Sequence, residues 1–258
     1  MQFQVRRIWI ESVLAIWKFK SLGVQSLAFG ILVTSILFAF ATQSHAFRQS
    51  DLVEGFKKTA FGSEFSRLGF SSRYVRKFNG TVRFYVRSEV GVDHKRRVER
   101  FIRSLNRVSP NLSTKIVTKA SSANFTVHVV RRRNFEDVVR KHILRRANAP
   151  VFGKCLVRSI YSRSGISRSD AVIVADEGDK LFRRCMIEEL VQGLGLLNDD
   201  ASLRYSMFND TSRFTSFQRF DKALLIMLYD PRVKNGASMS SINPLLPSIA
   251  NSAIKRVR

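Results

Sequence analysis

The uncharged stretch near the N-terminus constrains the fold most, because it decides which residues can belong to the folded domain. Residues 22–41 contain no charged side chain, and four basic residues precede them between positions 6 and 20. Ser44-His45-Ala46 follows, with small residues at the two positions that a signal peptidase reads. We therefore expect residues 1–46 to be a signal peptide that is cleaved after Ala46. The alternative is an uncleaved membrane anchor, because 20 uncharged residues can span a bilayer.

Export fixes the compartment in which the remaining residues fold. The domain is expected to be periplasmic or secreted, or anchored to the inner membrane if the leader stays uncleaved. Cys155 and Cys185 are the only cysteines in the chain, and an oxidising compartment favours their pairing. A disulfide between them would close a loop of about 30 residues and stabilise the fold by roughly 3 to 4 kcal/mol.

The exported part is strongly basic. Residues 47–258 hold 40 Lys and Arg against 19 Asp and Glu, a net charge of +21. Most of these cations are Arg, which binds phosphate and carboxylate groups in a bidentate manner. The matching partners outside the cytoplasm are anionic envelope components such as lipid phosphates, acidic glycans or the cell wall, and nucleic acid is not expected. Membrane contact would come through an uncleaved leader or the basic surface, and the alternative is a charge that serves solubility alone.

Hydrophobic periodicity predicts alternating strands and helices over the exported part. The expected fold class is α+β (mixed α/β), a twisted mixed sheet with helices packed on it and a smaller C-terminal helical part. In chain order we expect a strand at 82–86, a helix at 93–108, strands at 113–118 and 123–130, a short helix from 134, strands at 155–162 and 171–175 joined by a loop at 162–169, a long helix at 178–194 and a final helix at 217–228.

These elements divide the exported part into three segments. Residues 47–80 form a polar and aromatic lead-in with no firm periodicity, and residues 81–232 form the domain. Residues 233–258 combine turn signals with a basic end, which predicts a flexible basic tail.

The segment from position 185 to 199 has the most informative spacing. Residues four apart share a face of a helix, so Glu188 and Gln192 project together with Glu189 beside them, and a turn at Gly195 brings Asn198 back toward them. This layout is similar to the zinc-peptidase pattern H-E-x-x-H-x-x-G-x-x-H, in which helical ligands and a general base surround one metal. In that pattern Glu189 occupies the general-base position and Gly195 the turn.

The ligand chemistry of this segment differs from that pattern. Glu188, Gln192 and Asn198 stand where three histidines would bind zinc, and the histidines of the exported part are on other expected elements, at positions 94, 128 and 142. Zinc is therefore not expected. One carboxylate and two amides offer oxygen ligands, which suit Ca²⁺, Mg²⁺ or Mn²⁺, although a single charge makes such a site weak. The alternative is an ordinary amphipathic helix with a glycine cap and no cofactor.

The order of elements resembles the N-terminal half of the metzincin peptidases, in which a buried strand precedes the active-site helix. Tyr205-Ser206-Met207-Phe208 is similar to the methionine turn beneath the metal of that clan, and the run from Asp221 to Tyr229 is similar to its closing helix. The resemblance implies a metzincin-like zincin fold with Gly195 and Met207 in structural positions.

A second resemblance is more specific. The segment C-x-x-E-E-x-x-Q-x-x-G-L-x-N-D, from Cys185 to Asp199, and the run L-Y-D-P-R at positions 228–232 resemble an exported bacterial family catalogued as domain of unknown function 2927. This resemblance implies a metzincin-like fold in which replacement of the histidines is the family's own pattern. It implies no known activity.

Two functions are consistent with these features. In the first, a non-peptidase groove binds an envelope ligand, which would be a peptide, a glycan or an anionic polymer. In the second, the domain is a hydrolase in which Glu189 acts as general base, with no metal or with an oxygen-coordinated one. Peptide hydrolysis without a Lewis acid loses its main source of charge stabilisation, so we favour the binding function.

Overall fold

Our computed structural model of the chain describes residues 47–61 and 73–257. The predicted signal peptide, residues 1–46, lies outside the described residues. Among the helices in the described part of the chain, none combines the length and the apolar character needed to cross a membrane.

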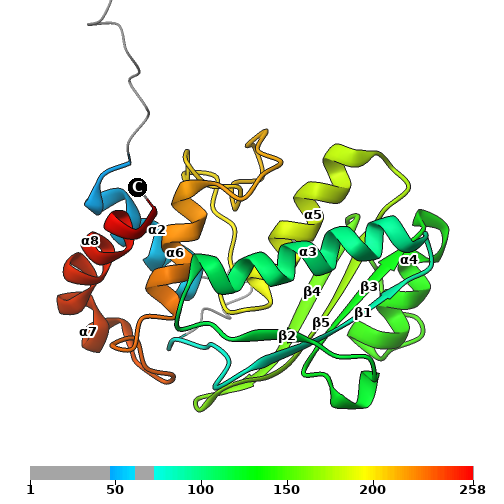
Figure 1. Ribbon diagram of the computed structural model, residues 1–258, viewed down its shortest axis with the longest axis horizontal. Helices are drawn as coiled ribbons and strands as arrows, with labels where there is room; N and C mark the ends of the chain where they lie inside the picture. Colours follow the sequence, from blue (N-terminus) through cyan, green and yellow to red (C-terminus); the bar gives the residue numbers. More distant parts are fainter. Residues whose placement is uncertain (1–46, 62–72, 258) are drawn as a thin grey trace, which may run out of the picture. The chain divides into compact units, whose positions relative to one another are not determined.

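A five-stranded sheet forms the centre of the described unit (Figure 1). The strand order is β2-β1-β3-β5-β4, in which β4 pairs antiparallel to β5 and the other neighbours are parallel. The predicted mixed sheet is therefore confirmed. The strands are β1 (Val82–Ser88), β2 (Thr114–Ile116), β3 (Phe125–Val130), β4 (Cys155–Ser162) and β5 (Gly165–Val174).

Strand β5 is longer than the sequence predicted. The residues expected to form a loop at 162–169 instead continue the β4–β5 hairpin, with Ser162 paired to Gly165 and Ser159 to Ser169. Polar side chains are tolerated there because Ser167 and Arg168 are exposed, and β5 pairs with β3 only from Ser169 onward. The apolar run 171–174, by contrast, is fully buried.

Helices cover both faces of the sheet, which explains why the central strands are apolar on both sides. Alternate residues of β5 belong to different cores. Ala171 and Ile173 lie on the side of α5 (Asp179–Gln192), in the core that also includes α3 (Val92–Val108), which packs on β1 and β2. Val172 and Val174 lie on the side of α4 (Arg132–Val138) and the π-helical turn η3 (Val139–Leu144). Figure 1 shows α3 running across one face of the sheet.

A helical layer beside the sheet corrects two predictions. The lead-in contains α2 (Gln49–Phe61), whose Leu52, Phe56 and Ala60 are fully buried against α6 (Arg219–Leu228) and α8 (Leu246–Val257). The expected flexible tail is ordered into α7 (Met239–Ile242), the short turn η4 (Asn243–Leu245) and α8.

The C-terminal helix α8 forms because its buried residues have helical spacing. Leu246, Ile249, Ala250 and Ala253 follow the i, i+3, i+4, i+7 pattern and belong to the main core. The prediction of a flexible tail at 233–258 is wrong for this reason. The stripe contains two alanines and follows several turn signals, so its apolar character is weak in the sequence.

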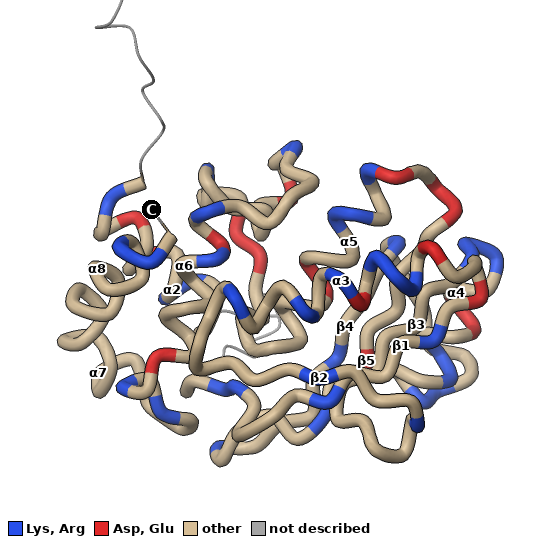
Figure 2. The backbone as a smooth tube through the Cα atoms, in the orientation of Figure 1, with Lys and Arg blue, Asp and Glu red and all other residues tan. Residues whose placement is uncertain are grey.

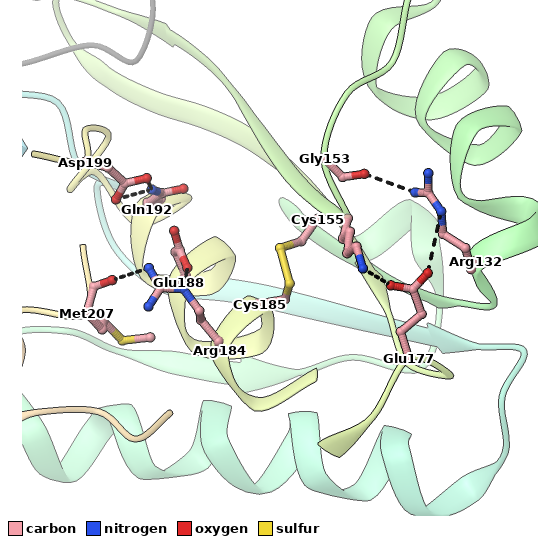
Figure 3. Close-up of a disulfide and its surroundings, with 11 residues drawn as sticks. Arg132, Gly153, Cys155, Glu177, Arg184, Cys185, Glu188, Gln192, Asp199 and Met207 are labelled. Atoms are coloured by element: carbon pink, nitrogen blue, oxygen red, sulfur yellow. Dashed lines mark hydrogen bonds and ion pairs between the residues drawn. A yellow bond between two sulfur atoms is a disulfide. The ribbon is translucent and has the colours of Figure 1, made fainter. Parts of the chain in front are cut away.

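The predicted disulfide is present. Cys155 at the start of β4 is bonded to Cys185 in α5, with 5.7 Å between their Cα atoms. The bond ties the edge strand of the sheet to the helix that carries the sequence motif, as Figure 3 shows.

Candidate functional site

Helix α5 begins at the surface, and its C-terminal part lies in the interior. Every residue from Cys185 to Gln192 is buried, including Glu188 and Glu189, which are 8% and 6% exposed. Buried carboxylates need hydrogen bonds or opposite charges around them. The surroundings of these two side chains therefore decide what the motif can do.

Two glycines after α5 allow close contact with its neighbours. A Cβ atom at Gly193 would lie 2.4 Å from the Phe125 ring. At Gly195 the backbone φ is +126°, and a Cβ atom would lie 2.2 Å from the carbonyl oxygen of Arg76. Glycine is required at both positions, and the turn that the spacing predicted at Gly195 occurs there.

The turn does not bring all the predicted positions together. Gln192 donates from Nε2 to both carboxylate oxygens of Asp199, at 3.0 Å each (Figure 3). Asn198, the position predicted for a third ligand, instead donates from Nδ2 to the carbonyl oxygen of Lys58 in α2, at 3.2 Å. Asp199 therefore faces the helix, and Asn198 joins α5 to α2.

Arg184, which the sequence analysis did not single out, lies at the centre of the site. Its Nε is 3.1 Å from Glu188 Oε2, and both side chains are largely buried. Its remaining nitrogens donate to the carbonyl oxygens of Met207, Asn209 and Ser212 at 2.9 to 3.1 Å. The i, i+4 spacing of Arg184 and Glu188 could have indicated this pair.

Met207 lies in a loop that a buried carboxyl group holds in place. Asp221, at the start of α6, accepts hydrogen bonds from Ser206 Oγ at 2.5 Å and from the Met207 N–H at 3.3 Å. The pKa of Asp221 is raised to about 7, chiefly by burial and to a smaller extent by the negative charge of Glu188, against the opposing effect of its hydrogen bonds. Met207 is fully buried beneath the site.

Three carboxylates converge next to this ion pair. Glu188, Asp199 and Asp210 each offer an oxygen, and these oxygens lie within 4.8 Å of one another. Carboxylate oxygens suit Ca²⁺, Mg²⁺ or Mn²⁺. Arg184, which is paired to Glu188, supplies positive charge to this group.

The histidines of the described part lie elsewhere. His94 packs against the Phe182 ring, and His128 in β3 stacks on His142 in η3 with 4.5 Å between ring centroids. The pKa of His128 is lowered to about 4, chiefly by burial and also by the neighbouring His142. In the parts of the chain that are described, no histidine joins a group able to hold a metal.

The fold defines the class of this protein as mixed α/β with a five-stranded mixed sheet and a buried helix that carries the E-E-x-x-Q motif. A family model described as protein of unknown function (DUF2927) matches residues 49–248. The chain belongs to this family. The match begins with the first residue of α2 and ends in the first turn of α8, so α2 lies within the family domain and most of α8 follows the matched residues. No curated protein matches the chain.

Proposed function

We propose that this protein is an exported, metzincin-like domain that binds an anionic ligand of the cell envelope and does not hydrolyse peptides. Metzincin likeness is supported by the buried strand β5 before α5 and by the buried Met207 below it. Export is supported by the leader, with its basic start, its apolar stretch and its small residues around Ala46.

The Arg184–Glu188 ion pair carries the proposal that the motif is not catalytic. Glu188 occupies a ligand-equivalent position, and Arg184 supplies the opposite charge there with four further hydrogen bonds to the loop 207–212. A guanidinium cannot polarise a carbonyl as a Lewis acid does. In this arrangement the charges of the motif fasten α5 to the Met207 loop.

The net charge of +21 on residues 47–258 supports an anionic ligand. A surplus of that size concentrates anions around the protein. Arg also pairs with oxyanions through two parallel hydrogen bonds.

One observation favours a second candidate function. The carboxylates of Glu188, Asp199 and Asp210 could hold a hard divalent cation, and buried Glu189 would then be the general base of a hydrolase. In that case the cation would compete with Arg184 for Glu188.

The two functions are distinguished by metal content and turnover. We expect protein purified from the periplasm to contain no stoichiometric metal, to hydrolyse no peptide or glycan, and to bind at least one of three anionic probes: polyphosphate, a carboxylated glycan or phosphatidylglycerol vesicles. Stoichiometric Ca²⁺, Mg²⁺ or Mn²⁺ that Glu188→Ala removes, with turnover that Glu189→Gln abolishes, would establish the hydrolase instead. Asp93→Ala is the matched control, because its side chain is 90% exposed in α3.

A further inference from the structure

An open groove lies on the other side of α5 from the carboxylate cluster. Its volume is about 850 Å³, and it is bounded by α3, α5, α6, the loop before α6 and the end of α8. Its floor is apolar and includes two aromatic rings, Phe101 and Phe217, that pack edge to face with centroids 5.6 Å apart. The other apolar lining residues are Val108, Met186, Ile187 and Val257.

The groove is lined by basic side chains on both walls. Arg97, Arg100 and Arg107 come from α3, whereas Arg219 and Lys222 come from α6. Arg183 of α5 and Arg256 of α8 complete the set, and no Asp or Glu is among the described residues that line the groove. Six of these seven cations are Arg, which favours phosphate and carboxylate groups over other anions.

Most of these cations have no ion-pair partner among the described residues. Asp179 pairs with Arg97 at 2.5 Å and with Arg183 at 2.7 Å. The other five cations form no ion pair within residues 47–61 and 73–257. Like charges that share a groove repel one another, so an anion bound between them relieves that repulsion.

The shape of the groove selects among anions. The cations of α3 extend from position 97 to 107, which spans about 15 Å along the helix. Cations of α6 and α8 form the opposite wall, so a bound chain would be contacted from two sides. A flat lipid surface would reach the outer rim but not the floor of a concave groove. A polymer with closely spaced negative charges matches the row of Arg side chains on α3 better than a polymer with widely spaced carboxylates.

We infer that the groove between α3, α5, α6 and α8 binds a linear, phosphate-bearing polymer. This inference rests on the proposed function. It adds the chemical class of the anionic ligand and the surface that binds it. The phosphates lie between the two cationic walls, and the connecting chain passes over the apolar floor.

The test compares two double charge reversals in the periplasm-purified protein. Arg100→Glu/Lys222→Glu changes opposite walls of the groove, and Lys119→Glu/Arg146→Glu makes the same change at exposed positions outside it. The probe is fluorescently labelled polyphosphate, titrated by fluorescence anisotropy at ~0.15 M ionic strength. We expect the groove variant to bind at least about tenfold more weakly and the control variant to stay within about threefold. Circular dichroism checks that both variants are folded.

Three outcomes would overturn the inference. Equal weakening in both variants would mean that total charge, rather than the groove, binds the polymer. Unchanged binding in the groove variant would place the site elsewhere. Vesicles of phosphatidylglycerol and phosphatidylcholine that bind more tightly than polyphosphate would make the surface a membrane contact. If the unsubstituted protein binds none of the anionic probes, the proposed function itself fails, which is a different result from loss of the groove alone.

Discussion

The two sides of helix α5 use charge in opposite ways. On the motif side, Glu188 is buried and paired with Arg184, and Gln192 is hydrogen-bonded to Asp199. On the groove side, Arg183 is 55% exposed, and Met186 and Ile187 line an open surface with basic walls. Figure 2 shows acidic positions in the segment between α5 and α6 and basic positions along α3.

The contrast between the two sides indicates where function can be sought in such a fold. The polar groups of the motif side hold the helix, the Met207 loop and α2 together, so their loss should affect stability first. Arg100 and Lys222 of the groove form no ion pair among the described residues, so we expect their loss to affect binding first. Under the proposed function, the spacing that resembles a catalytic motif marks the structural side of α5.

The largest effect is expected for Gly195→Ala, which should disturb both sides. The new Cβ would lie 2.2 Å from the Arg76 carbonyl oxygen at a φ of +126°, so the end of α5 would have to move. We expect the free energy of unfolding, measured with urea, to fall by about 4 kcal/mol or more, because the costs of backbone strain and overpacking add to each other. Gly80→Ala is the control: its φ is +72°, but no atom lies within 4 Å of the new Cβ. Similar losses in both variants would show that φ strain, not the contact with Arg76, is the cause.

Arg184→Met should break the motif side alone. It leaves Glu188 buried without its ion-pair partner and frees the loop that carries Met207. The expected loss is about 3 to 5 kcal/mol in urea unfolding. Arg183→Met, one residue away on the exposed side, should cost no more than about 1 kcal/mol. Comparable losses in the two variants would contradict the contrast between the two sides.

Asp221 should make the motif side sensitive to pH. Its pKa is raised from 3.8 to about 7, so the folded state holds the proton more tightly than the unfolded chain. Stability from this group is therefore present below about pH 4 and is lost as the pH rises to about 7. Over this pH range, the free energy of unfolding of the native protein should fall by on the order of 3 kcal/mol relative to that of Asp221→Asn. Urea unfolding at successive pH values measures the difference, and parallel curves would refute the raised pKa.

The smallest effect on stability is expected in the groove. Arg100→Gln/Lys222→Gln should change the free energy of unfolding by no more than about 0.5 kcal/mol, because neither side chain has an ion-pair partner among the described residues. If stability changes, it should increase at ~0.01 M salt, because the substitutions remove repulsion between like charges. This increase should disappear at ~1 M salt, where that repulsion is screened. Thermal unfolding at the two salt concentrations checks this. A loss above 1 kcal/mol would assign these cations to the fold.

The sequence predicted the elements whose pattern is strong and local. The run 171–174 indicates a buried strand because it is apolar on both faces, and α3 follows from its apolar stripe at Val98, Ile102 and Leu105. The start of β5 was missed because residues near Arg168 are polar, and Arg168 is paired with Asp170 within the strand. Pairing with β4 stabilises this part, and such pairing is not visible in one segment.

The candidate site could be predicted only up to the end of α5. Helical spacing places Glu188 and Gln192 on one side, but the turn at Gly195 decides whether Asn198 or Asp199 faces them. Arg184 was missed because its hydrogen-bond acceptors lie 23 to 28 residues further along the chain. The groove was also beyond prediction, because it combines residues of α3, α5, α6 and α8 that are far apart in sequence.

The contact between α2 and α8 bears on how the chain reaches its native state. Gln49 in α2 donates to the carbonyl oxygen of Pro247 in α8, across 198 positions of the sequence, and the two helices share one core. Contacts of such long range form slowly, because a long loop must close before they stabilise anything. The part of α2 that packs on α8 thus stays uncovered until α8 has emerged, whereas the part that packs on α6 is covered earlier. A chain cut short before α8 would keep the segments that form the sheet and α5, and would still expose that apolar part of α2, which favours aggregation.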